Sequence, residues 1–235
     1  MRTIRNHVAR LVTVMAVLLG GMAVAAAQAQ AAPQPLFGNL AICGNSPIPS
    51  GYVVTNEQSS NSCGGYLEYQ LTQVTTQTSL SVCGNSPLPN GWVITDAHSY
   101  NTCGGYLQYF LAKVTTQTSL MVCGNSPLPS GWVITDEHPY NTCGGKLQYF
   151  LAKVTTQTSL MVCGNSPIPD GWVVVNEQPY NTCGGYQQYS LAKVTTQTSL
   201  MVCGNSPIPA GWVVVSQRPY NTCGGYQQYS IQKVA

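Results

Sequence analysis

Apolar and polar residues alternate along one segment in each successive stretch of about 40 residues of this chain. In one such segment, Leu107, Tyr109 and Leu111 fall on one face of an extended chain, whereas Gln108 and Phe110 fall on the other. A period of two residues with one reliably apolar face is typical of a half-buried β-strand. No segment after the amino-terminal region shows a comparable period of 3.6 residues, so the pattern predicts an all-β fold.

Two groups of turn-forming residues divide each copy of this pattern into three short segments. In one copy they are residues 165–171, with the sequence Asn-Ser-Pro-Ile-Pro-Asp-Gly, and residues 178–185. Proline fixes φ and lacks an N–H, and glycine tolerates positive φ, so both residues interrupt strands. The segments beside them, such as residues 172–175 and 186–194, are rich in β-branched and aromatic residues. We expect each copy to form a three-stranded antiparallel meander.

The same frame occurs five times in tandem. It reads Cys-Gly-Asn-Ser-Pro-(Ile/Leu)-Pro-x-Gly-(Trp/Tyr)-Val, then Asn-(Thr/Ser)-Cys-Gly-Gly, then an apolar segment that ends in valine. The sequence therefore predicts an array of five three-stranded antiparallel units, each about 40 residues long and joined by connectors such as residues 75–78. The predicted repeats are residues 39–78, 79–118, 119–158, 159–198 and 199–235.

The amino-terminal region has the features of an export signal. Basic residues precede an uncharged apolar run at residues 11–27, and small-x-small cleavage sites follow at residues 27–31. This order predicts a secretory signal peptide and short leader over residues 1–32, followed by a lead-in at residues 33–38. A retained membrane anchor is the alternative, because the run is near the lower limit of about 17 residues for a spanning helix. The Ala/Gln-rich exit favours cleavage, so we expect a secreted, periplasmic or cell-surface protein without a membrane partner.

Removal of the predicted signal changes the charge of the protein. Three of the nine basic residues are Arg2, Arg5 and Arg10, so six remain against seven acidic residues, and the formal charge changes from +2 to −1. Nucleic-acid binding requires clustered cations that displace counterions from phosphates, and the remaining cations are scattered. We therefore expect no nucleic-acid partner and a neutral surface rich in hydrogen-bonding side chains.

The cysteines follow one another at a uniform spacing of twenty residues. Their even number in an exported chain predicts disulfides, which a unit of this size needs because it buries too little apolar surface to fold unaided. Structural zinc is the alternative, but its usual close Cys-x-x-Cys pairs do not occur. Pairing within each unit is favoured, since pairing across the connectors leaves Cys43 and Cys223 alone unless the array closes into a ring. The ten positions are Cys43, Cys63, Cys83, Cys103, Cys123, Cys143, Cys163, Cys183, Cys203 and Cys223.

The sequence gives little sign of a catalytic site, which would require a nucleophile, a base or a metal in a defined geometry. His98 and His138 occupy equivalent positions that hold Gln58 and Gln178 in other repeats, and we interpret them as solvated loop residues. The serine of the Asn-Ser-Pro frame recurs without an acid or histidine beside it, which indicates a turn residue bonded to nearby backbone. We expect no enzyme activity, no cofactor and no metal.

Aromatic residues occupy three recurring positions. The first holds tryptophan in four repeats and Tyr52 in the first repeat, and we interpret it as a core position beside the disulfide. The second and third flank the Asn-(Thr/Ser)-Cys-Gly-Gly turn, and the third must be partly exposed because Lys146 replaces tyrosine there. Such tyrosines suit stacking on sugars or peptides, although contacts between units would also explain them. The candidate binding residues are Tyr100, Tyr140, Tyr180 and Tyr220 in the second position and Tyr66, Tyr106, Tyr186 and Tyr226 in the third.

Three functions are compatible with these features. Repeated weak sites gain avidity when they engage together, so the first hypothesis is multivalent binding or adhesion to glycan or to a surface protein. The second is a structural component of the cell envelope or the extracellular matrix. The third is an inhibitor or effector built on a disulfide scaffold, which the near-identity of the copies disfavours because one divergent loop would be enough for that role.

Overall fold

The computed structural model describes residues 40–234. The predicted signal peptide and leader at residues 1–32 and the predicted lead-in at residues 33–38 lie outside the described residues.

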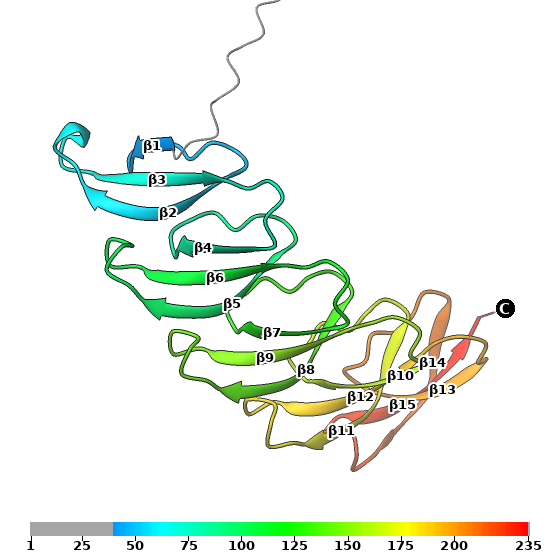
Figure 1. The fold of residues 1–235 in the computed structure, drawn as a ribbon. Coiled ribbons are helices and arrows are strands. Elements are labelled where there is room, and N and C mark those ends of the chain that lie inside the picture. Colours follow the sequence, from blue (N-terminus) through cyan, green and yellow to red (C-terminus); the bar gives the residue numbers. More distant parts are fainter. Residues whose placement is uncertain (1–39, 235) are drawn as a thin grey trace, which may run out of the picture. The chain divides into compact units, whose positions relative to one another are not determined.

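Each repeat forms one three-stranded antiparallel sheet, which confirms the predicted all-β array of five units (Figure 1). In every sheet the first strand is short, whereas the second and third are longer. The strands are β1 (Leu40–Cys43), β2 (Tyr52–Ser59) and β3 (Leu67–Gln73); β4 (Ser79–Cys83), β5 (Trp92–Ser99) and β6 (Leu107–Lys113); β7 (Ser119–Cys123), β8 (Trp132–Pro139) and β9 (Leu147–Lys153); β10 (Ser159–Cys163), β11 (Trp172–Pro179) and β12 (Gln187–Lys193); and β13 (Ser199–Cys203), β14 (Trp212–Pro219) and β15 (Gln227–Lys233).

The prediction of a meander is wrong, because the strands of each sheet do not follow one another in chain order. The third strand lies in the centre of each sheet, as in the order β1-β3-β2, and pairs with both neighbours. A meander would need a hairpin between the first two strands, but residues 44–51, the proline loop, contain Pro47 and Pro49 and carry the chain to the other side of the third strand. The third strand forms backbone hydrogen bonds along both of its edges, as β3 does with β1 and β2.

Each of the five units contains one disulfide between its two cysteines. This confirms the favoured pairing and excludes pairing across the connectors. Each bridge joins the end of the first strand to the loop between the second and third strands, as Cys43 and Cys63 do in repeat 1. That loop, residues 60–66 and its equivalents, is called the tyrosine loop below. The number of disulfides fits an oxidising compartment.

The disulfide of one repeat packs into the hydrophobic core of the repeat before it. The core of repeat 2 contains Trp92, Ile94 and Leu111 together with Val53 of repeat 1 and the Cys123–Cys143 bridge of repeat 3. The clusters centred on repeats 3 and 4 have the same composition. The tryptophans are 2–8% exposed, so the predicted core position is confirmed. Successive repeats therefore share their cores, as expected for a stacked repeat protein.

The second strand forms one edge of each sheet, and the next repeat satisfies its outward amides. In repeat 1 a β-bulge follows Val54, and the Val54 N–H donates to Oγ of Ser86 in repeat 2 at 2.9 Å. The Glu57 N–H donates to the backbone carbonyl of Thr102 at 2.7 Å. These bonds cover an edge that would otherwise be open to non-native pairing. The recurring serine also donates to its own loop, at the Pro87 carbonyl in repeat 2, as its turn interpretation implies.

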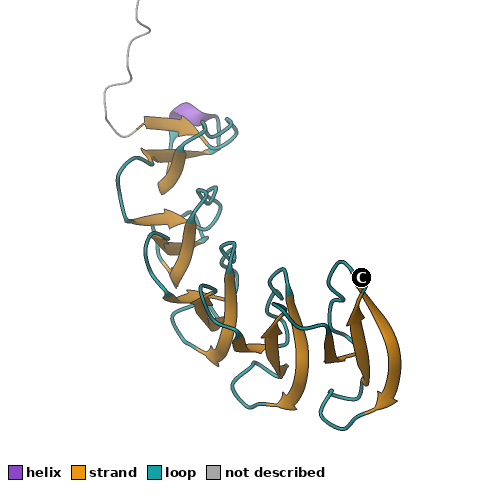
Figure 2. Ribbon diagram, turned by 90° about the vertical axis from the view of Figure 1, so that its right-hand side faces the viewer, coloured by secondary structure: helices purple, strands orange, loops and turns teal. Residues whose placement is uncertain are grey.

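Helical structure among the described residues is limited to the 3-10 turn η1 (Asn61–Cys63) in repeat 1, drawn in purple in Figure 2. Within the described repeats, no helix has the length and apolar character needed to cross a bilayer.

Candidate binding surface

The tyrosine loop is held in place by its own disulfide and by the preceding repeat. In repeat 4 the Tyr186 N–H donates to the Cys183 carbonyl at 2.8 Å, closing a turn at the end of the loop. Gly184 and Gly185 take the positive φ values of 60° and 94° that this turn requires. The Thr182 carbonyl accepts the Glu137 N–H of repeat 3 at 2.6 Å. The loop is therefore anchored at its centre and presents its first and last residues.

Those first and last residues are the two sets of tyrosines singled out from the sequence. Every member is between 41% and 58% exposed, in contrast to the buried tryptophans. Repeats 2, 4 and 5 carry a tyrosine at both ends of the loop, whereas repeat 1 has Ser60 at the first position and repeat 3 has Lys146 at the last. The eight residues are Tyr66, Tyr100, Tyr106, Tyr140, Tyr180, Tyr186, Tyr220 and Tyr226.

Polar and uncharged groups surround the exposed rings. An asparagine follows the first loop position in every repeat and is exposed, as Asn181 is in repeat 4. Lys146 supplies the one loop cation, and in repeat 5 the Arg218 guanidinium lies over the Tyr220 ring at 5.4 Å from its centroid. The surface can therefore stack on a ligand and form neutral hydrogen bonds, and it offers little fixed charge to an ionic ligand.

In repeats 2, 4 and 5 the last tyrosine of the loop lies near the boundary with the preceding repeat. Burial raises the pKa of Tyr149 in repeat 3, and the charges of Glu137 and of Tyr186 in repeat 4 raise it further. Tyr106 acts in the same way on Tyr69. These tyrosines are close to the repeat boundary yet remain half exposed, so contacts between repeats account for only part of their surface.

His98 and His138, the histidines among the described residues, lie on strands rather than in loops, which corrects the sequence interpretation. His98 is in β5 and its Nε2 contacts Oδ2 of Asp96 at 2.9 Å, while its ring meets Phe110 edge-on at 5.9 Å between centroids. His138 in β8 repeats this arrangement with Asp136. Pairing with the third strand resumes after the β-bulge, where His98 lies opposite Gln108 and His138 opposite Gln148, so the strand continues through polar residues that resemble a turn. Between residues 40 and 234 no three His, Cys, Asp or Glu side chains gather as a metal site would require.

Buried glutamates between repeats are a feature that sequence reasoning missed. Glu137 is 2% exposed, and Nδ2 of Asn165 in repeat 4 donates to its Oε1 at 2.5 Å, while Oε2 has no partner among the described residues. Burial raises the pKa of this carboxyl, the Asn165 hydrogen bond lowers it in part, and Asp136 raises it again. Glu57 and Glu177 are also buried, and burial raises their pKa, but there Asn85 and Asn205 donate to the hydroxyls of Tyr69 and Tyr189 at 3.2 Å. The next repeat covers these carboxyls, which assigns them to the interface and leaves no access for a substrate.

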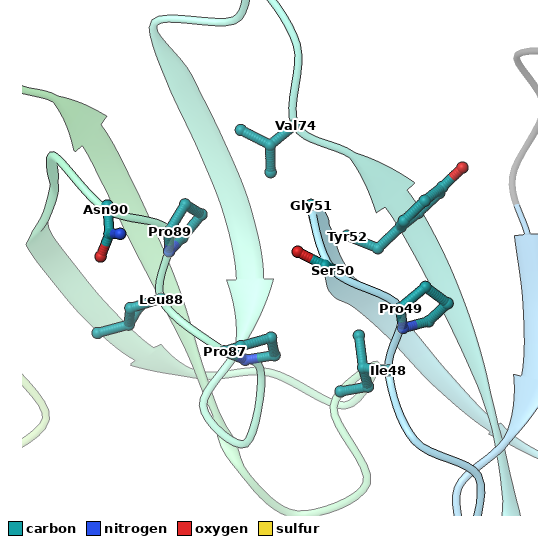
Figure 3. A pocket seen from close by; sticks show the side chains of 10 residues that line it. All are labelled: Ile48, Pro49, Ser50, Gly51, Tyr52, Val74, Pro87, Leu88, Pro89 and Asn90. Carbon is teal, nitrogen blue, oxygen red and sulfur yellow. The ribbon is translucent and has the colours of Figure 1, made fainter.

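Shallow grooves lie between the proline loops of successive repeats, at the other end of the sheets from the tyrosine loops. In Figure 3, Ile48 and Pro49 of repeat 1 face Pro87 and Leu88 of repeat 2 across a groove of about 340 Å³. Comparable grooves of about 510 and 400 Å³ lie between repeats 3 and 4 and between repeats 4 and 5. Their lining is mostly proline and aliphatic, with few convergent polar groups to orient a ligand. The tyrosine loops are therefore the stronger candidate surface.

The fold and this surface define a class of protein, a disulfide-linked all-β tandem repeat with one exposed aromatic loop in each unit. No family model, curated protein or solved structure matches the chain.

Proposed function

We propose that this chain is an exported, non-enzymatic protein that binds neutral glycan polymers through its tyrosine loops. The observation that carries the proposal is the recurrence of half-exposed tyrosines at the two ends of a loop that is fixed in each repeat. The core of the repeats accounts for the tryptophans, but it does not account for these tyrosines.

The chemistry of the loop favours an uncharged sugar over other ligands. A tyrosine ring offers a flat apolar face to the C–H face of a sugar, and its hydroxyl and the neighbouring asparagine can exchange hydrogen bonds with sugar hydroxyls. The described repeats carry six basic and seven acidic residues, which provide no strong field to attract a charged polymer.

Repetition converts weak sites into stable attachment. A polymer that occupies one loop presents its next segment to the following loop at high effective concentration, so avidity can exceed the affinity of one site by about 10²–10⁴. The disulfide and the repeat interface hold the rings before binding, which limits the entropy lost on ordering. The proposal therefore requires several loops to act together.

The test uses substitutions that the chain already tolerates at equivalent positions. The loop variant replaces both tyrosines in repeats 2, 4 and 5. The first position is changed to serine, as at Ser60, and the last position is changed to lysine, as at Lys146. The residues are Tyr100, Tyr180 and Tyr220 at the first position and Tyr106, Tyr186 and Tyr226 at the last. The matched control is Met121→Ser, which copies Ser81 and alters an exposed side chain on the first strand of repeat 3. Binding to insoluble polysaccharides and to a glycan array is measured with the oxidised protein.

We expect saturable binding by the parent and the control and a loss of at least about tenfold in the loop variant, with partial variants between them. Equal binding by all three proteins would refute the proposal. Capture of a surface protein without glycan binding would assign the same loops to protein adhesion. A structural role in the envelope or matrix is the second candidate, and the apolar residues exposed on β14, Val213 and Val214, favour it because they could contact another molecule.

A further inference from the structure

The two end repeats expose faces that every internal repeat buries. Val173 and Val174 of repeat 4 are fully buried against repeat 5. Their equivalents in repeat 5, Val213 and Val214, are 47% and 44% exposed. The β14 edge thus keeps the apolar residues of an internal interface, whereas a terminal repeat in a soluble array usually has a polar outer face.

Repeat 1 exposes the complementary face. Ser46 is exposed, whereas its equivalents in repeats 2 to 5 are buried by the repeat before them. A Cβ placed on Gly64 would have no atom within 4 Å, but one placed on Gly104 would meet Glu57 and Leu67 of repeat 1. Among the described residues the Cys43–Cys63 bridge fills no neighbouring core, in contrast to the bridges of repeats 2 to 5.

The groups that form an internal interface are present on these two faces. Val174 N–H donates to Ser206 Oγ at 2.9 Å inside the array, and the corresponding groups at the ends are Val214 N–H and Ser46 Oγ. The Glu177 N–H donates to the Thr222 carbonyl at 2.7 Å, for which Gln217 N–H and the Ser62 carbonyl are the equivalents. Asn205 Nδ2 donates to the Tyr189 hydroxyl at 3.2 Å, and Asn45 and Tyr229 correspond to this pair.

One difference at the end face favours contact between chains. Glu137 and Glu177 are buried carboxyls inside the array, whereas repeat 5 has Gln217 at that position. A neutral amide can exchange hydrogen bonds with the facing asparagine, and its burial does not require a charge to leave water. The end face can therefore close on a partner without this electrostatic cost.

We propose that repeat 1 of a second copy of this chain docks on repeat 5, so that copies associate head to tail through an interface equivalent to those between internal repeats. The two faces differ, so the contact is heterologous and generates rings or open filaments rather than a closed two-fold dimer. This inference goes beyond glycan binding and does not depend on it, because none of the eight candidate binding tyrosines is among the groups named for the contact. Association would multiply the number of tyrosine loops held on one assembly.

The experiment compares two variants that each damage one face. Val214→Asp places a charge on the exposed face of repeat 5, and Ser46→Arg places a bulky cation where the proposed interface needs a serine hydroxyl. The control is Met201→Asp, because its equivalents Met121 and Met161 remain exposed in internal repeats. The oxidised full chain, processed by the expressing cell, is studied by sedimentation velocity and light scattering over a wide range of concentrations, and its fold is checked by circular dichroism.

We expect the parent and the control to form concentration-dependent oligomers and each face variant to be monomeric with an unchanged spectrum. A mixture of the two variants should give dimers and stop there, because each variant keeps the face that the other has lost. A parent that stays monomeric at every concentration overturns the proposal. Oligomers that survive in only one of the variants also overturn it, because they indicate contact between like faces.

Discussion

The serine of the proline loop provides a direct test of how the repeats are joined. In repeat 3, Ser126 Oγ accepts the backbone N–H of Ile94 from repeat 2 at 2.9 Å, and both residues are buried. Ser126→Ala removes the acceptor and leaves that N–H unpaired next to a β-bulge, where the sheet offers it no other partner. An unsatisfied buried donor costs about 1–3 kcal/mol, so we expect a loss of unfolding free energy in that range.

Repeat 1 supplies the matched control. Ser46→Ala makes the same chemical change in the same loop, but Ser46 is exposed and no preceding repeat lies against it among the described residues. A surface substitution of this kind changes stability by less than about 0.5 kcal/mol. Urea unfolding followed by tryptophan fluorescence gives the free energies, and amide hydrogen exchange reports locally on Ile94.

The difference in unfolding free energy between Ser126→Ala and Ser46→Ala shows whether the serine joins two repeats. Equal losses in both would show that the serine acts only within its own turn. Unchanged protection of the Ile94 amide in Ser126→Ala would contradict the assignment even if stability fell, because the lost hydrogen bond would then lie elsewhere.

Three further outcomes follow from the same interfaces. Burial raises the pKa of Glu137 above its unfolded value of about 4.3, so its stabilising contribution is present below that value and lost as pH rises through the folded pKa. Glu137→Gln should reduce this decline in urea unfolding measured against pH, with the exposed Asp170→Asn as the charge control, and an unaltered decline would contradict the reasoning. Gly184→Ala should reduce the free energy of unfolding by about 1–3 kcal/mol more than Gly64→Ala does, because both glycines have positive φ near 60° but only the Cβ at position 184 would meet the preceding repeat. Calorimetric melting compares the two variants, and similar losses of stability would point to backbone strain alone. Replacing both cysteines of repeat 1 by alanine should reduce the free energy of unfolding by about 3 kcal/mol, through the lost loop closure. The same change in repeat 3 should cost about 2 kcal/mol more, because its bridge fills the core of repeat 2. Guanidinium unfolding measures both losses, and equal losses would refute the shared core.

The sequence predicted features that depend on one repeat alone. Alternation identified the strands, uniform cysteine spacing with no residue left over favoured pairing within units, and the tryptophans were assigned to the core. Each of these inferences rests on local periodicity or on counting. The order of the strands could not be obtained in this way, because residues 44–51 are long enough either to return beside the first strand or to cross to the far edge.

Features that require a neighbouring repeat were not predictable from the pattern. Ser86 bonds a residue thirty-two positions earlier in the chain, and no local signal gives that distance. The buried Glu57 resembles any exposed acidic residue near a turn, since its environment is created by the loop of repeat 2. The bulge that places His98 on a strand likewise depends on pairing across the sheet.

The recurring residues of the frame fall into two groups that differ in burial. A residue between repeats must fit the same partner at each boundary, which accounts for the recurrence of the serine, of the first glycine of each pair and of the disulfide, whereas the second glycine recurs because the turn requires its positive φ. The tyrosines at the ends of the loop recur without such a constraint, because about half of each side chain is exposed and the chain itself carries serine or lysine at the same positions. Burial thus explains why most of the frame repeats but not why the exposed tyrosines recur, and it is this recurrence that our proposal of glycan binding addresses.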